Sequence, residues 1–134
     1  MEVYNMEASG ERCRLPEGLE VKAAASGGYE VLVRYGSWRV AVITYAERFD
    51  RANLCRLERH METDEVFVLM AGSATLFIGD EGTPVVMEPY RAYNVKQAIW
   101  HNICVSADAQ VLICENLDTG LENTEYMDWT PALV

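Results

Sequence analysis

Positive charge is scarce in this sequence. Its 134 residues include 11 Lys and Arg against 21 Asp and Glu, which gives a formal net charge of −10. Nucleic acids and anionic membrane surfaces are bound through clustered Lys and Arg, so this balance predicts neither as a partner. The length suits one domain with one core, and we therefore expect residues 1–134 to form a single domain.

Long apolar runs are missing as well. The longest, residues 66–71, has six residues and is too short to cross a bilayer. The first seven residues contain acids and no apolar segment, which predicts no signal peptide. The four cysteines form no CxxC pair and match neither a zinc ribbon nor a dense disulfide framework. These absences predict a cytoplasmic protein with reduced thiols.

Short β-rich runs separated by turn residues fill the sequence from about residue 20 to residue 116. The run at 66–69 is β-branched and aromatic and has no helical period. Many short strands with turn signals between them predict an all-β sandwich or barrel. The expected strands are 19–24, 29–35, 38–45, 54–60, 65–70, 74–78, 85–87, 92–95, 99–105 and 111–115.

The ends of the chain are expected to add to this barrel. We place the core barrel at about residues 35–116, with further strands in residues 1–34. Residues 117–134 form a polar, acidic tail with enough apolar side chains to dock against the barrel or a partner subunit. Thr119 could cap one helical turn there.

The stretch from Glu58 to Gly72 carries the chemistry. Glu58 and His60 are two residues apart on an expected strand, so their side chains face the same side. Polar residues then let the chain turn, and Glu65 begins the next strand, which ends at Gly72. Two adjacent strands thereby bring two carboxylates and an imidazole to one rim.

This stretch resembles the first motif of the cupin family. That motif is a His-x-His pair, three or four residues, a Glu, six residues and a Gly. His60, Glu65 and Gly72 match its second His, its Glu and its Gly, while Glu58 replaces the first His. In the second cupin motif His101 matches the His, and other residues stand where Pro, Gly and Asn are expected. The sequence has two histidines, and both fall at motif positions.

The resemblance implies a cupin-type double-stranded β-helix barrel, or jelly roll. Carried over by position, it implies a divalent metal held by Glu58, His60, Glu65 and His101. Two histidines with two carboxylates suit Mn, Fe, Ni or Zn, and the ligand types alone do not choose among these metals. Such a site could polarise a carbonyl or bind dioxygen.

Two functions follow from the resemblance. The first is a metal-dependent enzyme that acts on a small carboxylated or sugar-like metabolite. Because the first motif His is lost, the alternative is a barrel that binds a small ligand without metal and without turnover. Cupins commonly dimerise, and the outward apolar side chains of Val66, Val68 and Met70 need cover, which together predict a homodimer.

Alternation along the strands predicts the pocket walls. Arg56, Phe67 and Ile103 share the inward face with the candidate ligands. Arg56 could hold a substrate carboxylate or pair with Glu58 or Glu65. If the connection at 106–109 is a hairpin of even length, Cys114 also faces the pocket, opposite His101. A hairpin of odd length would instead turn Glu115 inward.

Overall fold

The protein is almost entirely β in the computed structural model, which describes residues 4–6 and 12–132. Three-residue 3₁₀ turns are the only helical elements in these ranges, so the described chain contains no helix able to cross a membrane. The turns are η1 (Glu47–Phe49), η2 (Arg51–Asn53) and η3 (Leu121–Asn123). The strands are β1 (Tyr4–Met6), β2 (Arg12–Arg14), β3 (Gly28–Tyr35), β4 (Trp38–Thr44), β5 (Arg56–His60), β6 (Glu65–Ala71), β7 (Ala74–Ile78), β8 (Thr83–Val86), β9 (Ala92–Val95), β10 (His101–Val105), β11 (Gln110–Asn116) and β12 (Thr124–Asp128).

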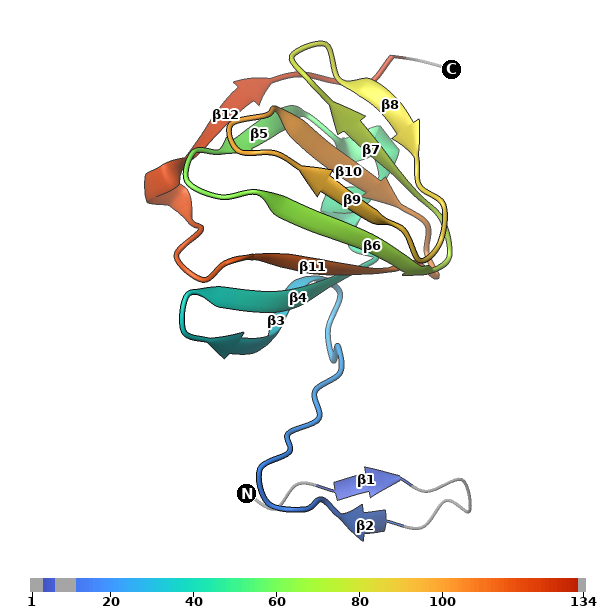
Figure 1. The fold of residues 1–134 in the computed structure, drawn as a ribbon. Coiled ribbons are helices and arrows are strands. Elements are labelled where there is room, and N and C mark those ends of the chain that lie inside the picture. Colours follow the sequence, from blue (N-terminus) through green and yellow to red (C-terminus); the bar gives the residue numbers. More distant parts are fainter. Residues whose placement is uncertain (1–3, 7–11, 133–134) are drawn as a thin grey trace.

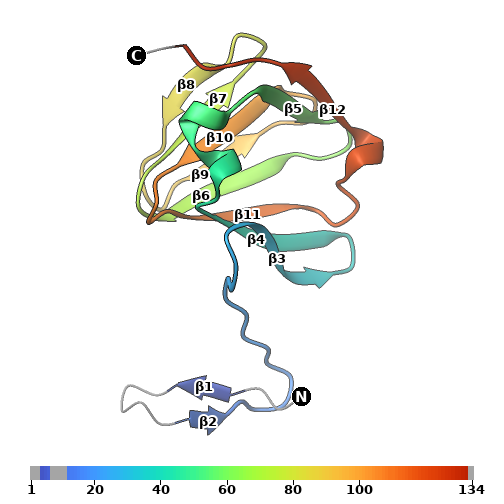
Figure 2. The ribbon, with the colours of Figure 1, turned by 180° about the vertical axis from the view of Figure 1, so that it is seen from behind.

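Two five-stranded antiparallel sheets form the barrel. One has the order β12-β5-β10-β7-β8 and the other β3-β4-β11-β6-β9. Figures 1 and 2 show the sheets facing each other, with the β1–β2 hairpin set apart at the end of an extended segment. Several chain neighbours, such as β5 and β6 or β10 and β11, lie in opposite sheets. The predicted all-β barrel is confirmed.

The core lies between the two sheets because side chains alternate along each strand. In β6, Phe67 and Leu69 are buried while Val66 and Val68 are only half-buried. In β10, Ile103 is buried in the same way between half-buried neighbours. Successive strand residues point to opposite faces, so every second residue lies inside the barrel. Apolar side chains fill one part of this interior, and polar side chains occupy the other part.

A second, smaller core covers the outside of one sheet. Leu54, Leu57 and Phe77 are buried there beneath Trp129 and other side chains. The C-terminal segment supplies this cover, because β12 pairs with β5 and leads directly into Trp129. The Trp129 ring lies 5.1 Å from that of Phe77. A Cβ on Gly82 would lie 2.4 Å from the indole, so the glycine allows this close approach.

The strands at both ends of the barrel differ from those expected from the sequence. Residues 19–24 form no strand and are exposed, because no neighbouring strand pairs with them. The tail was expected to form one helical turn, and it forms η3 followed by β12. The two sheets extend beyond the 35–116 range expected for the core barrel. β3, which was expected as a strand, precedes that range, and β12 follows it.

Trp129→Ala should lower the free energy of unfolding by about 3 kcal/mol, because it uncovers the outer core of one sheet. Leu121→Ala is the control, since Leu121 is 81% exposed and its loss should change stability by less than about 0.5 kcal/mol. Urea unfolding of the two variants measures both values. Equal effects of the two substitutions would contradict the role given to the tail.

Candidate functional site

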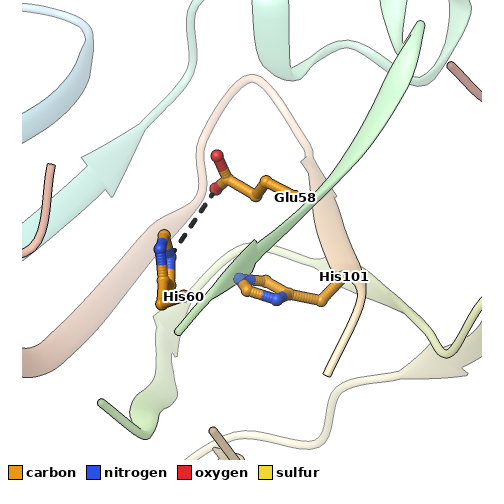
Figure 3. A group of neighbouring side chains, drawn as sticks. All are labelled: Glu58, His60 and His101. Atoms are coloured by element: carbon orange, nitrogen blue, oxygen red, sulfur yellow. Dashed lines mark ion pairs between the residues drawn. The ribbon is translucent and has the colours of Figure 1, made fainter. Parts of the chain in front are cut away.

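Three strands bring the predicted polar residues together inside the barrel. β5 carries Glu58 and His60, and its neighbour β10 places His101 directly opposite Glu58. Glu65 begins β6 in the facing sheet. Figure 3 shows the side chains of Glu58, His60 and His101 converging from β5 and β10. All four residues thus meet between the two sheets.

These residues line a cavity of about 390 Å³, which is large enough for a small metabolite. Its apolar wall includes Phe67 and Ile103, as alternation predicted, and Arg56 also lines it. The polar and aromatic side chains around the rest of the cavity belong to Tyr29, Arg39, Arg48, Phe49, Asn53, Cys55, Asn102, Glu115, Thr124 and Tyr126.

Glu65 joins the two histidines. Its Oε1 lies 2.9 Å from His101 Nε2 and 3.3 Å from His60 Nε2, and its side chain is almost fully buried. Burial opposes ionisation of this carboxyl, but hydrogen bonds with His101 and His60 outweigh it and hold the pKa of Glu65 below its usual value. Burial lowers the pKa of each histidine, whereas the hydrogen bond and the negative charge of Glu65 raise it. The pKa values of both His60 and His101 are raised as a result.

A hydrogen-bond partner at Nδ1 orients each imidazole. His101 Nδ1 lies 2.9 Å from the carbonyl oxygen of Ile99, which can only accept, so Nδ1 carries a proton. His60 Nδ1 lies 2.9 Å from Thr124 Oγ1. Each ring therefore turns Nε2 toward Glu65 and the cavity. Histidine ligands in metal sites are commonly held by such a contact at the other ring nitrogen.

Glu115, which sequence reasoning placed only conditionally, is a fifth member of this group. Tyr29 donates to its Oε1 at 2.5 Å, and Arg39 donates to the same oxygen at 2.8 Å. Its Oε2 is buried, has no hydrogen-bond partner among the described residues and lies 3.9 Å from His60 Nε2. Burial and the neighbouring Glu65 carboxyl, through its negative charge and through a shared proton, raise the pKa of Glu115 to about 7, against the opposing hydrogen bonds of Tyr29 and Arg39.

The expectation that Cys114 lines the pocket is wrong. β10 and β11 do not form a hairpin, because residues 106–109 carry the chain from one sheet to the other. Glu115 is consequently inward, and Cys114 is exposed on the opposite face of β11. In the structure Arg39 is the cross-strand partner of Glu115, and their opposite charges favour this inward pair.

Arg56 makes no ion pair with Glu58 or Glu65. Its side chain is exposed at the cavity, and its guanidinium lies 4.0 Å from the centre of the Tyr126 ring. The salt bridges of the described chain do not include it. The predicted pairing with a buried acid is therefore absent.

The residues present fit a divalent metal. Ligand atoms of Glu58, His60 and His101 lie within 4.8 Å of one another, and so do those of His60, Glu65 and Glu115. The unpartnered Glu115 Oε2 is the strongest sign, since a buried carboxylate oxygen without a partner is costly. Imidazole nitrogens with carboxylate oxygens are the donor types of Mn, Fe, Ni and Zn sites.

Solved structures identify the fold. A cupin-2 domain containing protein from Shewanella frigidimarina aligns over 70% of this chain and 84% of its own, with 14% identity and a TM-score of 0.53. Pac13 from Streptomyces, a nucleoside dehydratase, aligns over 81% of this chain and 85% of its own, with 6% identity and a TM-score of 0.58. The chain has the cupin fold. Fe(II) HppE also matches this cupin barrel, over 86% of this chain and 64% of its own, with 16% identity and a TM-score of 0.55.

Sequence comparison adds no relative of this chain. No family model matches the chain, and no curated protein matches it either. The structural likeness is therefore one of fold, because identities this low carry no information about substrate. Function has to be argued from the cavity itself.

Arg39→Met should destabilise the metal-free protein by about 3 kcal/mol above pH 7, because it leaves the Glu115 carboxylate buried without its cation. The loss should shrink below pH 7, since Glu115 then takes up a proton and no longer carries an uncompensated charge. Urea unfolding at one pH above 7 and at one pH below 7 measures the loss of stability.

Arg59→Met is the matched control for this substitution. Arg59 pairs with Glu125 at 2.7 Å on the surface, so its loss should cost less than about 1 kcal/mol at either pH. A loss for Arg39→Met that is as small as that of the control would contradict the buried Arg39–Glu115 pair.

Proposed function

We propose that this cupin is a metal-dependent enzyme acting on a small carboxylated or sugar-like metabolite. The observation that carries the proposal is the convergence of two Nε2 atoms and three carboxylates on one cavity. Glu58, His60, Glu65 and His101 are the proposed ligands expected from the sequence, and Glu115 joins them. An apolar wall beside such a polar floor is typical of a small-molecule site.

Each residue has a distinct role in this proposal. Thr124 and Ile99 hold the two imidazoles so that their Nε2 atoms face inward. When bound, a divalent metal would supply Lewis acidity to a carbonyl or hydroxyl oxygen of the substrate. In the metal-free protein Glu115 can hold or release a proton near neutral pH, because burial raises its pKa to about 7, and it would be a carboxylate when it binds the metal. Tyr29 and Arg39 fix the orientation of that carboxyl.

The neighbours of known structure agree with this class of function. Pac13 is a nucleoside dehydratase, and HppE was solved with Fe(II). The same fold therefore carries an enzyme and a metal-containing protein, although neither name transfers to this chain.

A barrel that binds a small ligand without metal is the second candidate. It is favoured by one observation, the contacts of Glu65 Oε1 with both His101 Nε2 and His60 Nε2. These contacts satisfy the three side chains without an ion, so the same pocket could hold a ligand through hydrogen bonds alone.

Metal analysis of the purified protein tests the proposal. After incubation with Mn, Fe, Ni or Zn salts, we expect about one bound metal ion per chain, and His60→Ala and His101→Ala should each abolish it. Glu115→Gln should weaken metal binding about tenfold, because an amide replaces a carboxylate ligand. Calorimetric titration and elemental analysis measure affinity and stoichiometry.

Cys114→Ser is the control for Glu115→Gln. The two residues are neighbours on β11 but face opposite sides, so the control should bind metal as the unaltered protein does. Absence of stoichiometric metal under metal-replete conditions would rule out the metal-dependent enzyme and leave the metal-free binding barrel.

The homodimer stays a prediction. Val66, Val68 and Leu112 on the outward face of the sheet containing β6 and β11 are half-buried, and Met70 is 41% exposed. An apolar sheet face of this kind is a common contact between two copies of a chain. Light scattering coupled to size-exclusion chromatography should give twice the mass of the 15.1 kDa chain, and the mass of one chain would contradict the dimer.

A further inference from the structure

Two arginines at the cavity have no carboxylate partner. Arg48 on η1 and Arg56 at the start of β5 both line the cavity, and both side chains are exposed. The salt bridges of the described residues involve Arg39, Arg59 and Arg91 but neither of these two. Both arginines therefore bring an unpaired positive charge to the same cavity.

Aromatic rings hold both guanidinium groups. Arg48 lies 4.3 Å from the centre of the Phe49 ring, and Arg56 lies 4.0 Å from that of Tyr126. Stacking on a ring occupies the face of a guanidinium and leaves its N–H edge free to donate. It also reduces the freedom that the side chain would lose on binding a ligand. Both guanidinium groups therefore lie against an aromatic ring of the cavity wall, where they can donate to a bound anion.

Charge is divided unequally within the cavity. Glu58, Glu65 and Glu115 gather around the two histidines, whereas Arg48 and Arg56 are exposed residues of the cavity rim. An anionic group would be attracted by the two unpaired arginines at the rim and would lie away from the carboxylates of Glu58 and Glu65 deeper in the cavity. A neutral, oxygen-bearing part of the same molecule would meet no charge repulsion beside the histidines.

We infer that Arg48 and Arg56 form an anion subsite that selects small metabolites carrying a carboxylate or phosphate group. The anion binds at the rim and directs the uncharged part of the molecule toward His60 and His101. This inference deepens the proposed function, since it names the substrate class of the same cavity. The arginine contacts themselves do not require a metal, and this allows separate tests.

NMR titration of the metal-free protein with malonate and, separately, with inorganic phosphate tests the subsite. Metal is first removed with a chelator, which is then dialysed away. We expect shifts of the amide signals of Asn53, Cys55 and Asn102, which line the cavity, with a Kd of about 1 mM for at least one anion. Malonamide, the neutral analogue of malonate, should cause no such shifts. Binding of malonate alone identifies a carboxylate, and binding of phosphate alone identifies a phosphate.

Arg48→Gln and Arg56→Gln should each weaken this binding about tenfold, because each removes a charged donor pair. Arg59→Gln is the matched control. Arg59 also lies over an aromatic ring, 4.5 Å from that of Trp100, but it is already paired with Glu125. Its substitution should leave the Kd within twofold. Both tested arginines are exposed, and dispersion of the NMR spectrum checks that each variant is folded.

The inference is overturned if neither anion shifts the cavity amides, or if Arg48→Gln and Arg56→Gln each bind the anion as tightly as the unaltered protein. Failure of the subsite and failure of the proposed function are distinguishable. Metal binding without anion binding removes the anion subsite and leaves the metal site, whereas anion binding without metal removes the metal-dependent enzyme and leaves the subsite.

Discussion

The site depends on a charged group held inside the barrel. Glu65 is 5% exposed, and a carboxylate so deeply buried needs compensating partners. His60 and His101 provide them from β5 and β10, which lie in the opposite sheet. The contacts of Glu65 with the two histidines therefore join the two sheets. They also bring the proposed metal-ligand atoms close together. Thr124 on β12 and the Ile99 carbonyl complete the arrangement by fixing the rings.

A second buried charge lies beside the first. Glu115 is neutralised at one oxygen by Arg39 and Tyr29 and is left unpartnered at the other. A purely structural carboxylate would be expected to satisfy both oxygens. Its Oε2 lies 3.9 Å from His60 Nε2 inside the cavity, where it can hold a proton shared with Glu65 when no ion is bound and can ligate an ion when one is present.

Much of the fold and part of the site were predictable from local pattern. Period-two alternation placed Glu58 and His60 on one face, and the cupin-like spacing of His60, Glu65 and Gly72 indicated the barrel. The orientation of β11 was not predictable, because both of its faces are apolar and the chain crosses between sheets at 106–109. β12 was missed because Thr124–Asp128 is a short, polar edge strand, and its pairing with β5 and the packing of Met127 depend on the tertiary structure. Arg48 reaches the cavity through η1, whose position depends on tertiary packing rather than on its own sequence.

Anomalous diffraction tests the metal centre most directly. Crystals grown without chelator after incubation with the metal that binds, and measured on either side of its absorption edge, should show one strong peak between the two sheets. The peak should lie about 2.0–2.2 Å from Nε2 of His60 and of His101, with carboxylate oxygens of the neighbouring glutamates completing its coordination. A cavity without an anomalous peak, in which Glu65 remains hydrogen-bonded to both imidazoles, would contradict the metal centre.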